Sequence, residues 1–274
     1  MAERWGRVLL TGAAGEIGTV LRPALRPTTH RLRLLDRVAI AAPDANEEVF
    51  NSDITSADAM MDATKDVDCV VHLAGIPREG APAEEIFHAN VLGCHLVYEA
   101  ARRNGVRRMI FASSNHVIGF YRADRQVGVD EPPRPDGYYG VSKVFGEALG
   151  RLHADKFGME VACLRIGSFR ARPEDARQLA TWISHGDMAR LARCCVEAPP
   201  FHYLVIYGLS ANRRACWGGD AAARAHVGYR PQDDAERFAT ELEALPAAAG
   251  PVAEAFHGGP AAAMGFVGDP ARVP

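Results

Sequence analysis

Two side chains that can transfer protons, Tyr139 and Lys143, stand four positions apart in the sequence. On a helix, residues with this spacing share one face. A phenol has an unperturbed pKa near about 10, and a neighbouring ammonium favours the phenolate form. The pair therefore predicts general base catalysis by Tyr139 with Lys143 beside it. The alternative interpretation is a surface tyrosine stacked on a lysine stem.

Ser114 could complete this group, because it follows an apolar segment that is predicted to be a strand. Ligands of open parallel sheets bind outside the carboxyl ends of the strands. A hydroxyl at that position can hold a substrate oxygen while the phenolate takes its proton. We therefore expect Ser114, Tyr139 and Lys143 to be the catalytic residues.

A glycine-rich turn lies near the N-terminus, between a predicted strand and a predicted helix. Its glycines are Gly12, Gly15 and Gly18, and Glu16 and Ile17 open the helix. Glycine lets the backbone approach a pyrophosphate, and the helix N-terminus supplies N–H groups and a positive dipole. This context predicts a dinucleotide site, whereas glycines alone could form an ordinary turn.

An acidic residue, Asp36, ends the second predicted strand. A carboxylate there accepts hydrogen bonds from a ribose 2'-hydroxyl and repels a 2'-phosphate, which favours NAD over NADP. The adjacent Arg37 could instead hold the extra phosphate. We expect further cofactor contacts after the third and fourth strands, from Asp53, Ile54, Leu73, Ala74 and Gly75.

These residues are positioned by apolar segments that alternate with helical patterns, which is typical of repeated βαβ units. The predicted fold is a Rossmann-type doubly wound parallel α/β sheet with a small C-terminal substrate-binding portion. Strands are predicted at residues 8–10, 32–35, 49–50, 69–73, 108–112, 161–166 and 203–206. Helices are predicted at residues 16–25, 57–64, 83–104, 139–157, 187–196 and 233–245.

The 274 residues are interpreted as a single domain. Its dinucleotide-binding core covers residues 1–168 and its substrate-binding portion residues 169–245. Residues 246–274 are rich in Ala, Gly and Pro, which indicates a linker and an extended tail.

Composition excludes some partners. The 31 basic and 34 acidic side chains nearly balance, which gives no electrostatic reason to expect nucleic acid or an anionic membrane surface. The six cysteines form no CxxC pair and no zinc spacing, so we expect no metal and a reduced, cytoplasmic protein. No signal peptide or membrane-spanning segment is predicted. We also expect a homo-oligomer.

In their order and intervals, the glycine turn, Asp36, Ser114 and the Tyr139/Lys143 pair resemble the extended short-chain dehydrogenase/reductase superfamily. The resemblance implies that Lys143 also binds the nicotinamide ribose and that hydride passes to or from nicotinamide C4. It covers about the first 170 residues.

A closer resemblance, over nearly the full chain, is to bacterial uronate dehydrogenases. It rests on the segments FASSNH at 111–116, GVSK at 140–143, RIGS at 165–168, TWISH at 181–185, SAN at 210–212 and FHGG at 256–259. It implies oxidation by NAD of the C1 hydroxyl of cyclic D-glucuronate or D-galacturonate, giving an aldarolactone. The implied residues that bind this sugar acid are Ser114, Asn115, His116, Ser168 and Arg177.

Arg177 suits the carboxylate, because a guanidinium offers it a planar bidentate fork. Arg177 could also be a solvated loop residue, and Asn115 and His116 could only satisfy backbone at a strand end. Two positions depart from the family pattern: Pro77 replaces a serine at the substrate, and Phe169, expected at the cofactor, replaces a smaller residue.

Two other functions remain open. One is a nucleotide-sugar epimerase or dehydratase, although such enzymes usually carry a larger C-terminal portion. The other is a non-catalytic nucleotide sensor, although sensors typically lose the tyrosine or the lysine.

Overall fold

A parallel sheet forms the centre of the computed structural model, which describes residues 4–41, 43–245 and 250–274. Its seven strands have the order β10-β7-β5-β4-β1-β2-β3. They are β1 (Trp5–Thr11), β2 (Thr29–Asp36), β3 (Glu47–Asn51), β4 (Cys69–His72), β5 (Arg108–Ser114), β7 (Glu160–Ile166) and β10 (Tyr203–Gly208). All seven predicted strands are confirmed, because buried parallel strands are continuous apolar segments.

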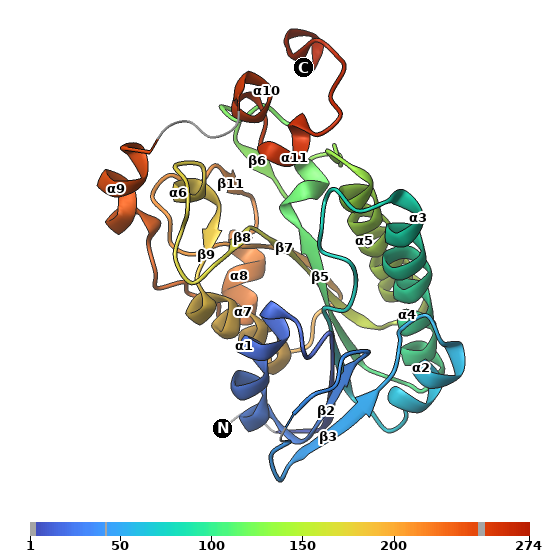
Figure 1. The fold of residues 1–274 in the computed structure, drawn as a ribbon. Helices are drawn as coiled ribbons and strands as arrows, with labels where there is room; N and C mark the ends of the chain where they lie inside the picture. Colours follow the sequence, from blue (N-terminus) through green and yellow to red (C-terminus); the bar gives the residue numbers. More distant parts are fainter. Residues whose placement is uncertain (1–3, 42, 246–249) are drawn as a thin grey trace.

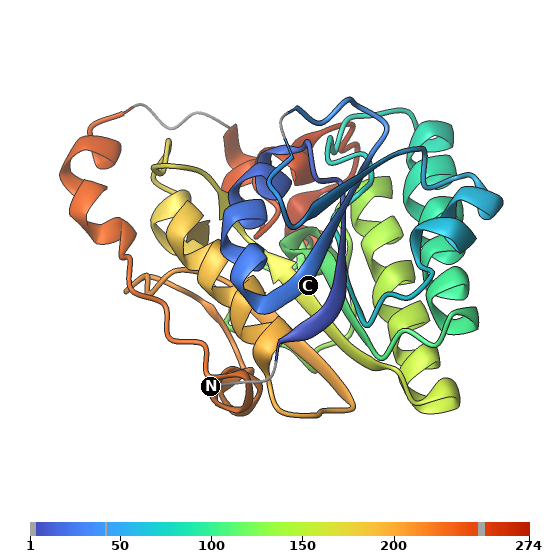
Figure 2. The same ribbon diagram turned by 90° about the horizontal axis from the view of Figure 1, so that it is seen from below.

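Helices cover both faces of this sheet (Figures 1 and 2). One apolar core lies between the sheet and α1 (Glu16–Leu25), α7 (His185–Glu197) and α8 (Ala221–Val227). A second core lies on the other face, under α2 (Ala57–Ala63), α4 (Cys94–Arg103) and α5 (Tyr138–Phe157). The predicted doubly wound fold is therefore confirmed. Within the described residues, no helix is both long and apolar enough to cross a membrane.

The helix predicted over residues 83–104 contains an irregular turn. It consists of α3 (Ala83–Ile86), the π-helix η2 (Phe87–Gly93) and α4. The π-turn places Asn90 inside, where its Oδ1 accepts from the Ile76 N–H at 2.7 Å and its Nδ2 donates to Ser142 Oγ at 3.1 Å. Asn90 thus connects the loop after β4 to helix α5.

Short elements fill the rest of the chain. Two small parallel pairs are separate from the main sheet: β8 (Ser168–Phe169) with β9 (Trp182–Ile183), and β6 (Val127–Gly128) with β11 (Trp217–Gly218). The short elements are η1 (Arg26–Thr28), η3 (Asn115–Ile118), β6 (Val127–Gly128), β8 (Ser168–Phe169), α6 (Gln178–Thr181), β9 (Trp182–Ile183), β11 (Trp217–Gly218), η4 (Ala235–Phe238), α9 (Ala239–Glu243) and η5 (Pro270–Arg272). Two-residue strands carry no detectable periodicity, so they were not predicted.

The prediction of an extended C-terminal tail is wrong for much of that segment. Two helices, α10 (Gly250–Ala255) and α11 (Pro260–Ala263), follow residues 246–249, where the predicted linker falls outside the described part of the chain. Phe256 is buried and its ring lies 5.5 Å from that of Phe120. The next residue, His257, donates its backbone N–H to the Tyr121 carbonyl. Apolar burial at Phe256 therefore overrides the linker-like composition.

Candidate active site

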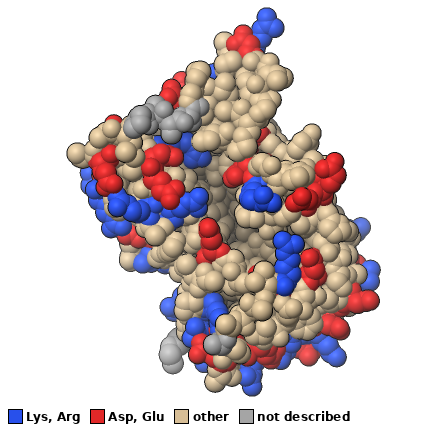
Figure 3. Space-filling view, in the orientation of Figure 1, with Lys and Arg blue, Asp and Glu red and all other residues tan. Residues whose placement is uncertain are grey.

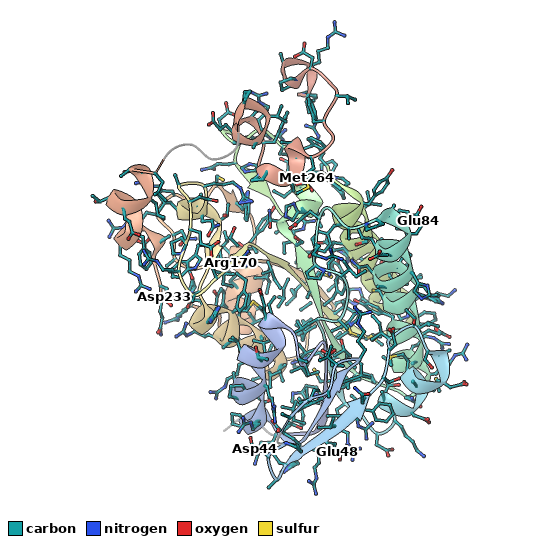
Figure 4. The ribbon with its side chains drawn as sticks, viewed as in Figure 1. Asp44, Glu48, Glu84, Arg170, Asp233 and Met264 are labelled. Carbon is teal, nitrogen blue, oxygen red and sulfur yellow. The ribbon has the colours of Figure 1, made fainter. Side chains whose placement is uncertain are left out.

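The main cavity lies at the carboxyl ends of the parallel strands. The strand order reverses between β1 and β4, and ligands of doubly wound sheets bind at such a point. The cavity has a volume of about 850 Å³. The hollow is visible in the space-filling view (Figure 3). Two residues that line it, Arg170 and Met264, come from different parts of the chain (Figure 4).

The glycine turn has the shape that a dinucleotide requires. Gly12 has a φ of 71°, and a Cβ there would lie 2.8 Å from the Ala74 nitrogen. A Cβ on Gly18 would lie 2.2 Å from the Gly12 carbonyl oxygen, so helix α1 packs directly on the turn. The N-terminus of α1, at Gly15 and Glu16, faces the cavity and can receive a pyrophosphate.

The Asp36 carboxylate lies at the adenosine end of the cavity, where two backbone N–H groups hold it. Its Oδ2 accepts from the Ala14 N–H at 2.9 Å and its Oδ1 accepts from the Val38 N–H at 3.0 Å. Each oxygen keeps a further lone pair for a ribose hydroxyl. Arg37 is exposed and Asp53 lines the same end. The residues of this end therefore fit a dinucleotide such as NAD.

The three predicted catalytic side chains meet in the middle of the cavity. Tyr139 and Lys143 lie in the first two turns of α5, and Ser114 ends β5. The Lys143 ammonium is buried, donates to the Ala112 carbonyl at 2.8 Å and lies 5.4 Å from the centre of the Tyr139 ring. Burial lowers the pKa of Lys143 to about 8.

The expectation that Lys143 lowers the pKa of Tyr139 is wrong for the protein alone. Burial raises the pKa of the phenol above its ordinary value, and a hydrogen bond with Ser114 offsets only part of this effect. The physical reason is that the ammonium is directed at a backbone carbonyl rather than at the phenol oxygen. Tyr139 is therefore a neutral phenol at neutral pH in this structure.

The predicted carboxylate ligand, Arg177, has few partners of its own. Its Nη1 makes only long contacts, 3.5 Å to Ser168 Oγ and 3.4 Å to Thr181 Oγ1. Its Nε is buried without a hydrogen-bond partner among the described residues. Burial lowers the pKa of Arg177 from its ordinary value. An anion in the cavity would satisfy this guanidinium.

His116 lies between two carboxylates that were not predicted. Its Nδ1 is 2.7 Å from Asp136 Oδ2 and its Nε2 is 3.1 Å from Glu79 Oε1. Burial alone would lower the pKa of His116, but the hydrogen bonds with Asp136 and Glu79 reverse this and raise it to about 9. Beside it, Asn115 is buried and its Nδ2 has no partner among the described residues.

The C-terminal segment closes over these groups. Gly258, Pro260, Ala261 and Met264 line the cavity, although their segment was predicted to be a tail. A Cβ on Gly258 would lie 1.8 Å from Asp136 Oδ2, so this glycine packs directly on that carboxylate.

Every predicted site residue lines this one cavity. Besides those described above, they include Ile17, Ile54, Leu73, Gly75, Pro77 and Phe169. The side chain of Ile54 points into the core against Gly93, and the Phe169 ring stacks on His185 at 4.5 Å. Glu79 and Asp136 were missed because each is a lone acid in a loop. The weak signals available were their closeness in sequence to Pro77 and Tyr139.

Comparison with known proteins identifies the family. A model of the NAD dependent epimerase/dehydratase family matches residues 8–212. A uronate dehydrogenase of Pseudomonas syringae pv. tomato is 41% identical, over 97% of this chain and 96% of its own. The chain belongs to the uronate dehydrogenase family. The predicted resemblance is confirmed, as are an oxidoreductase and its cofactor NAD.

Two further relatives bear on cofactor and substrate. The structure of a tyrosine variant of the uronate dehydrogenase from Agrobacterium tumefaciens, complexed with NAD, has a TM-score of 0.88 at 40% identity, covering 94% of this chain and 97% of that one. An NAD-dependent glucose-6-phosphate dehydrogenase of Haloferax volcanii is 37% identical, over 87% of this chain and 97% of its own.

Proposed function

We propose that this protein oxidises the C1 hydroxyl of a cyclic hexuronate, D-glucuronate or D-galacturonate, to an aldarolactone with NAD. The observation that carries the substrate class is the Arg177 guanidinium, which faces the cavity and whose side-chain contacts in the described part of the chain are with hydroxyls, not with a carboxylate. A sugar carboxylate would complete its hydrogen bonds, whereas a neutral sugar would leave them unmade.

The cofactor would lie along the strand ends from the glycine turn to α5. Gly12, Gly15 and Gly18 would receive its pyrophosphate and Asp36 its adenosine ribose. Backbone at Asp53 and Ile54 would face the adenine, and Leu73–Gly75 would line the path to the nicotinamide. Lys143 would bind the nicotinamide ribose, and Phe169 would border the ring. NAD supplies, when bound, the acceptor for the hydride that leaves C1.

Three side chains take part in removing the proton of the C1 hydroxyl. Ser114 holds the hydroxyl oxygen, and Tyr139 takes the proton once its phenol has ionised. Lys143, 5.4 Å from the ring centre, favours that ionised form as the reaction requires it. Because burial raises the pKa of Tyr139, turnover should increase with pH through the neutral range.

The departure at Pro77 removes one contact with the sugar. Proline offers neither a hydroxyl nor an N–H. Pro77 is exposed to the cavity two residues before Glu79, whose carboxylate is available there instead.

Cytoplasmic location and a homo-oligomer are part of the same proposal. Exposed apolar side chains on η2 and α5, among them Phe87, Tyr138 and Val141, support self-association. Sedimentation velocity of the purified protein tests it.

The test of the function is NADH formation with each uronate, compared with glucose, galactose, glucose 6-phosphate and UDP-sugars. We expect activity with one or both uronates and poor activity with the others. Preference for glucose 6-phosphate would contradict the substrate class, and preference for a UDP-sugar would favour an epimerase or dehydratase.

A further inference from the structure

We infer that Asp136 is a positioning residue: it holds His116 doubly protonated, so that His116 and Glu79 present a paired donor and acceptor to the hydroxyl groups of the sugar. The inference rests on the proposed function for the identity of the sugar. Its basis is the geometry of three side chains that come together from separate segments of the chain.

The two contacts of His116 favour a doubly protonated ring. Both ring nitrogens lie within hydrogen-bond distance of a carboxylate, at 2.7 Å and 3.1 Å. A carboxylate only accepts hydrogen bonds, so hydrogen bonds to both carboxylates require a ring with a proton on each nitrogen. A neutral histidine would turn a lone pair toward one of the two acids.

Asp136 is the buried one of the two carboxylates that contact His116. Its side chain is 2% exposed, against 37% for Glu79. Cβ atoms on Gly119 and Gly258 would lie 2.0 Å and 1.8 Å from Asp136 Oδ2, so two glycines form the slot that admits this carboxylate. Asp136 therefore has a fixed place behind the imidazole, away from the sugar.

Glu79, unlike Asp136, is accessible from the cavity. It lines the cavity and its carboxylate is partly exposed on the sugar side of His116. A sugar hydroxyl both donates and accepts, so it can receive the Nε2–H of His116 and donate to Glu79. This pair offers the hydrogen bonds that Pro77 cannot make.

The charged groups that face His116 determine the pH at which its ring loses a proton. Asp136 and Glu79 contact it directly, the Tyr139 ring lies 5.8 Å away, and Lys143 lies beyond Tyr139. Arg177 feels the charge of the same two carboxylates, and of Asp175, at distances longer than an ion pair. The raised pKa of His116, about 9, means that the ring carries both protons below that pH and one above it. The shorter contact of Nδ1 with the buried Asp136 favours keeping the proton on Nδ1, so the Nε2–H is the one lost.

The first experiment needs no variant. Long-range ¹H–¹⁵N NMR of the full chain at neutral pH should show both ring nitrogens of His116 protonated, with deprotonation near pH 9. His116→Gln assigns the signal. A neutral ring at neutral pH would overturn the inference. This outcome is independent of turnover, so an imidazolium in a protein that oxidises no uronate would overturn the proposed function alone.

The second experiment measures uronate binding to the NADH complex, where Tyr139 performs no chemistry. In the wild type, affinity should fall about ten- to hundredfold as pH rises through about 9, because a charge-assisted donor is lost. Asp136→Asn keeps the shape but removes the charge, so the fall should begin at least about one pH unit lower.

Two further variants keep this test decisive. Glu79→Gln should weaken binding about tenfold, because the acceptor loses its charge. Glu84→Gln, an exposed acid on α3 that does not line the cavity, is the matched control and should behave as the wild type (Figure 4). Circular dichroism shows whether Asp136→Asn is folded. If it is unfolded, the pH profile of Glu79→Gln and the NMR spectrum of the wild type test the inference without it. Profiles identical to the wild type in Asp136→Asn and Glu79→Gln would overturn the inference.

Discussion

Replacing Arg177 by methionine tests the substrate assignment most directly. The guanidinium has a buried Nε with no partner among the described residues and only two long contacts from Nη1. Methionine keeps much of the apolar stem and removes the charge. The carboxylate of the uronate should lose its guanidinium partner, while the cofactor end of the cavity is unchanged.

The expected loss follows from this environment. Removing one partner of a desolvated charge pair costs about 2–5 kcal/mol. Arg177 is only partly buried, so the lower half of that range applies. At about 1.4 kcal/mol per tenfold, kcat/KM for the uronate should fall roughly 30- to 300-fold. Glucose lacks the carboxylate, so its poor activity should hardly change.

The free energy of unfolding distinguishes a substrate-binding role of Arg177 from a structural one. An unsatisfied buried polar group costs about 1–3 kcal/mol in the folded protein. Arg177→Met removes such a group, so the free energy of unfolding should stay constant or rise by about 1 kcal/mol. Chemical denaturation measures it.

The control variant is Arg172→Met, an exposed arginine paired with Glu241 on the surface. Surface ion pairs contribute little, so this change should affect neither activity nor stability appreciably. If Arg177→Met leaves the ratio of uronate to glucose activity unchanged, Arg177 is only a loop residue. The substrate assignment would then depend on Ser114, Asn115, His116 and Ser168.

Four further substitutions have definite expected outcomes. Tyr139→Phe should lower kcat at least about a hundredfold while fluorescence titration shows unchanged NAD affinity; near-normal turnover would remove Tyr139 from the mechanism. Asp36→Ala should raise kcat/KM with NADP, and equal use of both cofactors by the wild type would contradict the role of Asp36. Pro77→Ser should lower the uronate KM about two- to tenfold by restoring a hydroxyl, and an unchanged KM would place residue 77 away from the sugar. Gly259→Ala should lower uronate kcat/KM about tenfold, because its φ is 61° and a Cβ would lie 2.3 Å from Arg177 Nε; unchanged kinetics would show that this segment does not hold the arginine.

The cofactor half of the site could be predicted because its determinants are local. A strand, a glycine turn and a helix follow one another directly, so the sequence order of Gly12, Gly15 and Gly18 already defines their geometry. Tyr139 and Lys143 are likewise separated by one turn of a single helix. Their positions required no knowledge of tertiary contacts.

The pKa of Tyr139 could not be predicted from that spacing. The four-residue interval gives proximity, but burial and the direction of the Lys143 ammonium decide the sign of the shift. The direction of the ammonium depends on the Ala112 carbonyl of β5, which is distant from Lys143 in sequence. Asp136 and Glu79 were missed for the same reason, because their partner His116 is distant in sequence from both.

The C-terminal segment shows a limit of composition. Ala, Gly and Pro are typical of linkers, yet in residues 250–263 they allow close packing. Gly258 fits against Asp136 and Gly259 against Arg177 because neither has a side chain. A segment rich in small residues can therefore be a linker or a segment packed tightly over a site. Which of these it is depends on the groups that it packs against.

The unequal pairing of the two cations orients the sugar acid. His116 already has two carboxylate partners, so a third carboxylate placed there would be repelled by Asp136 and Glu79. Among the described residues, the side-chain contacts of Arg177 are with hydroxyls and not with a carboxylate, so a bound carboxylate gains most at that position. The substrate should therefore direct its carboxylate to Arg177 and its hydroxyls to His116 and Glu79. Such an orientation leaves C1 free to approach Ser114 and Tyr139, which line the same cavity.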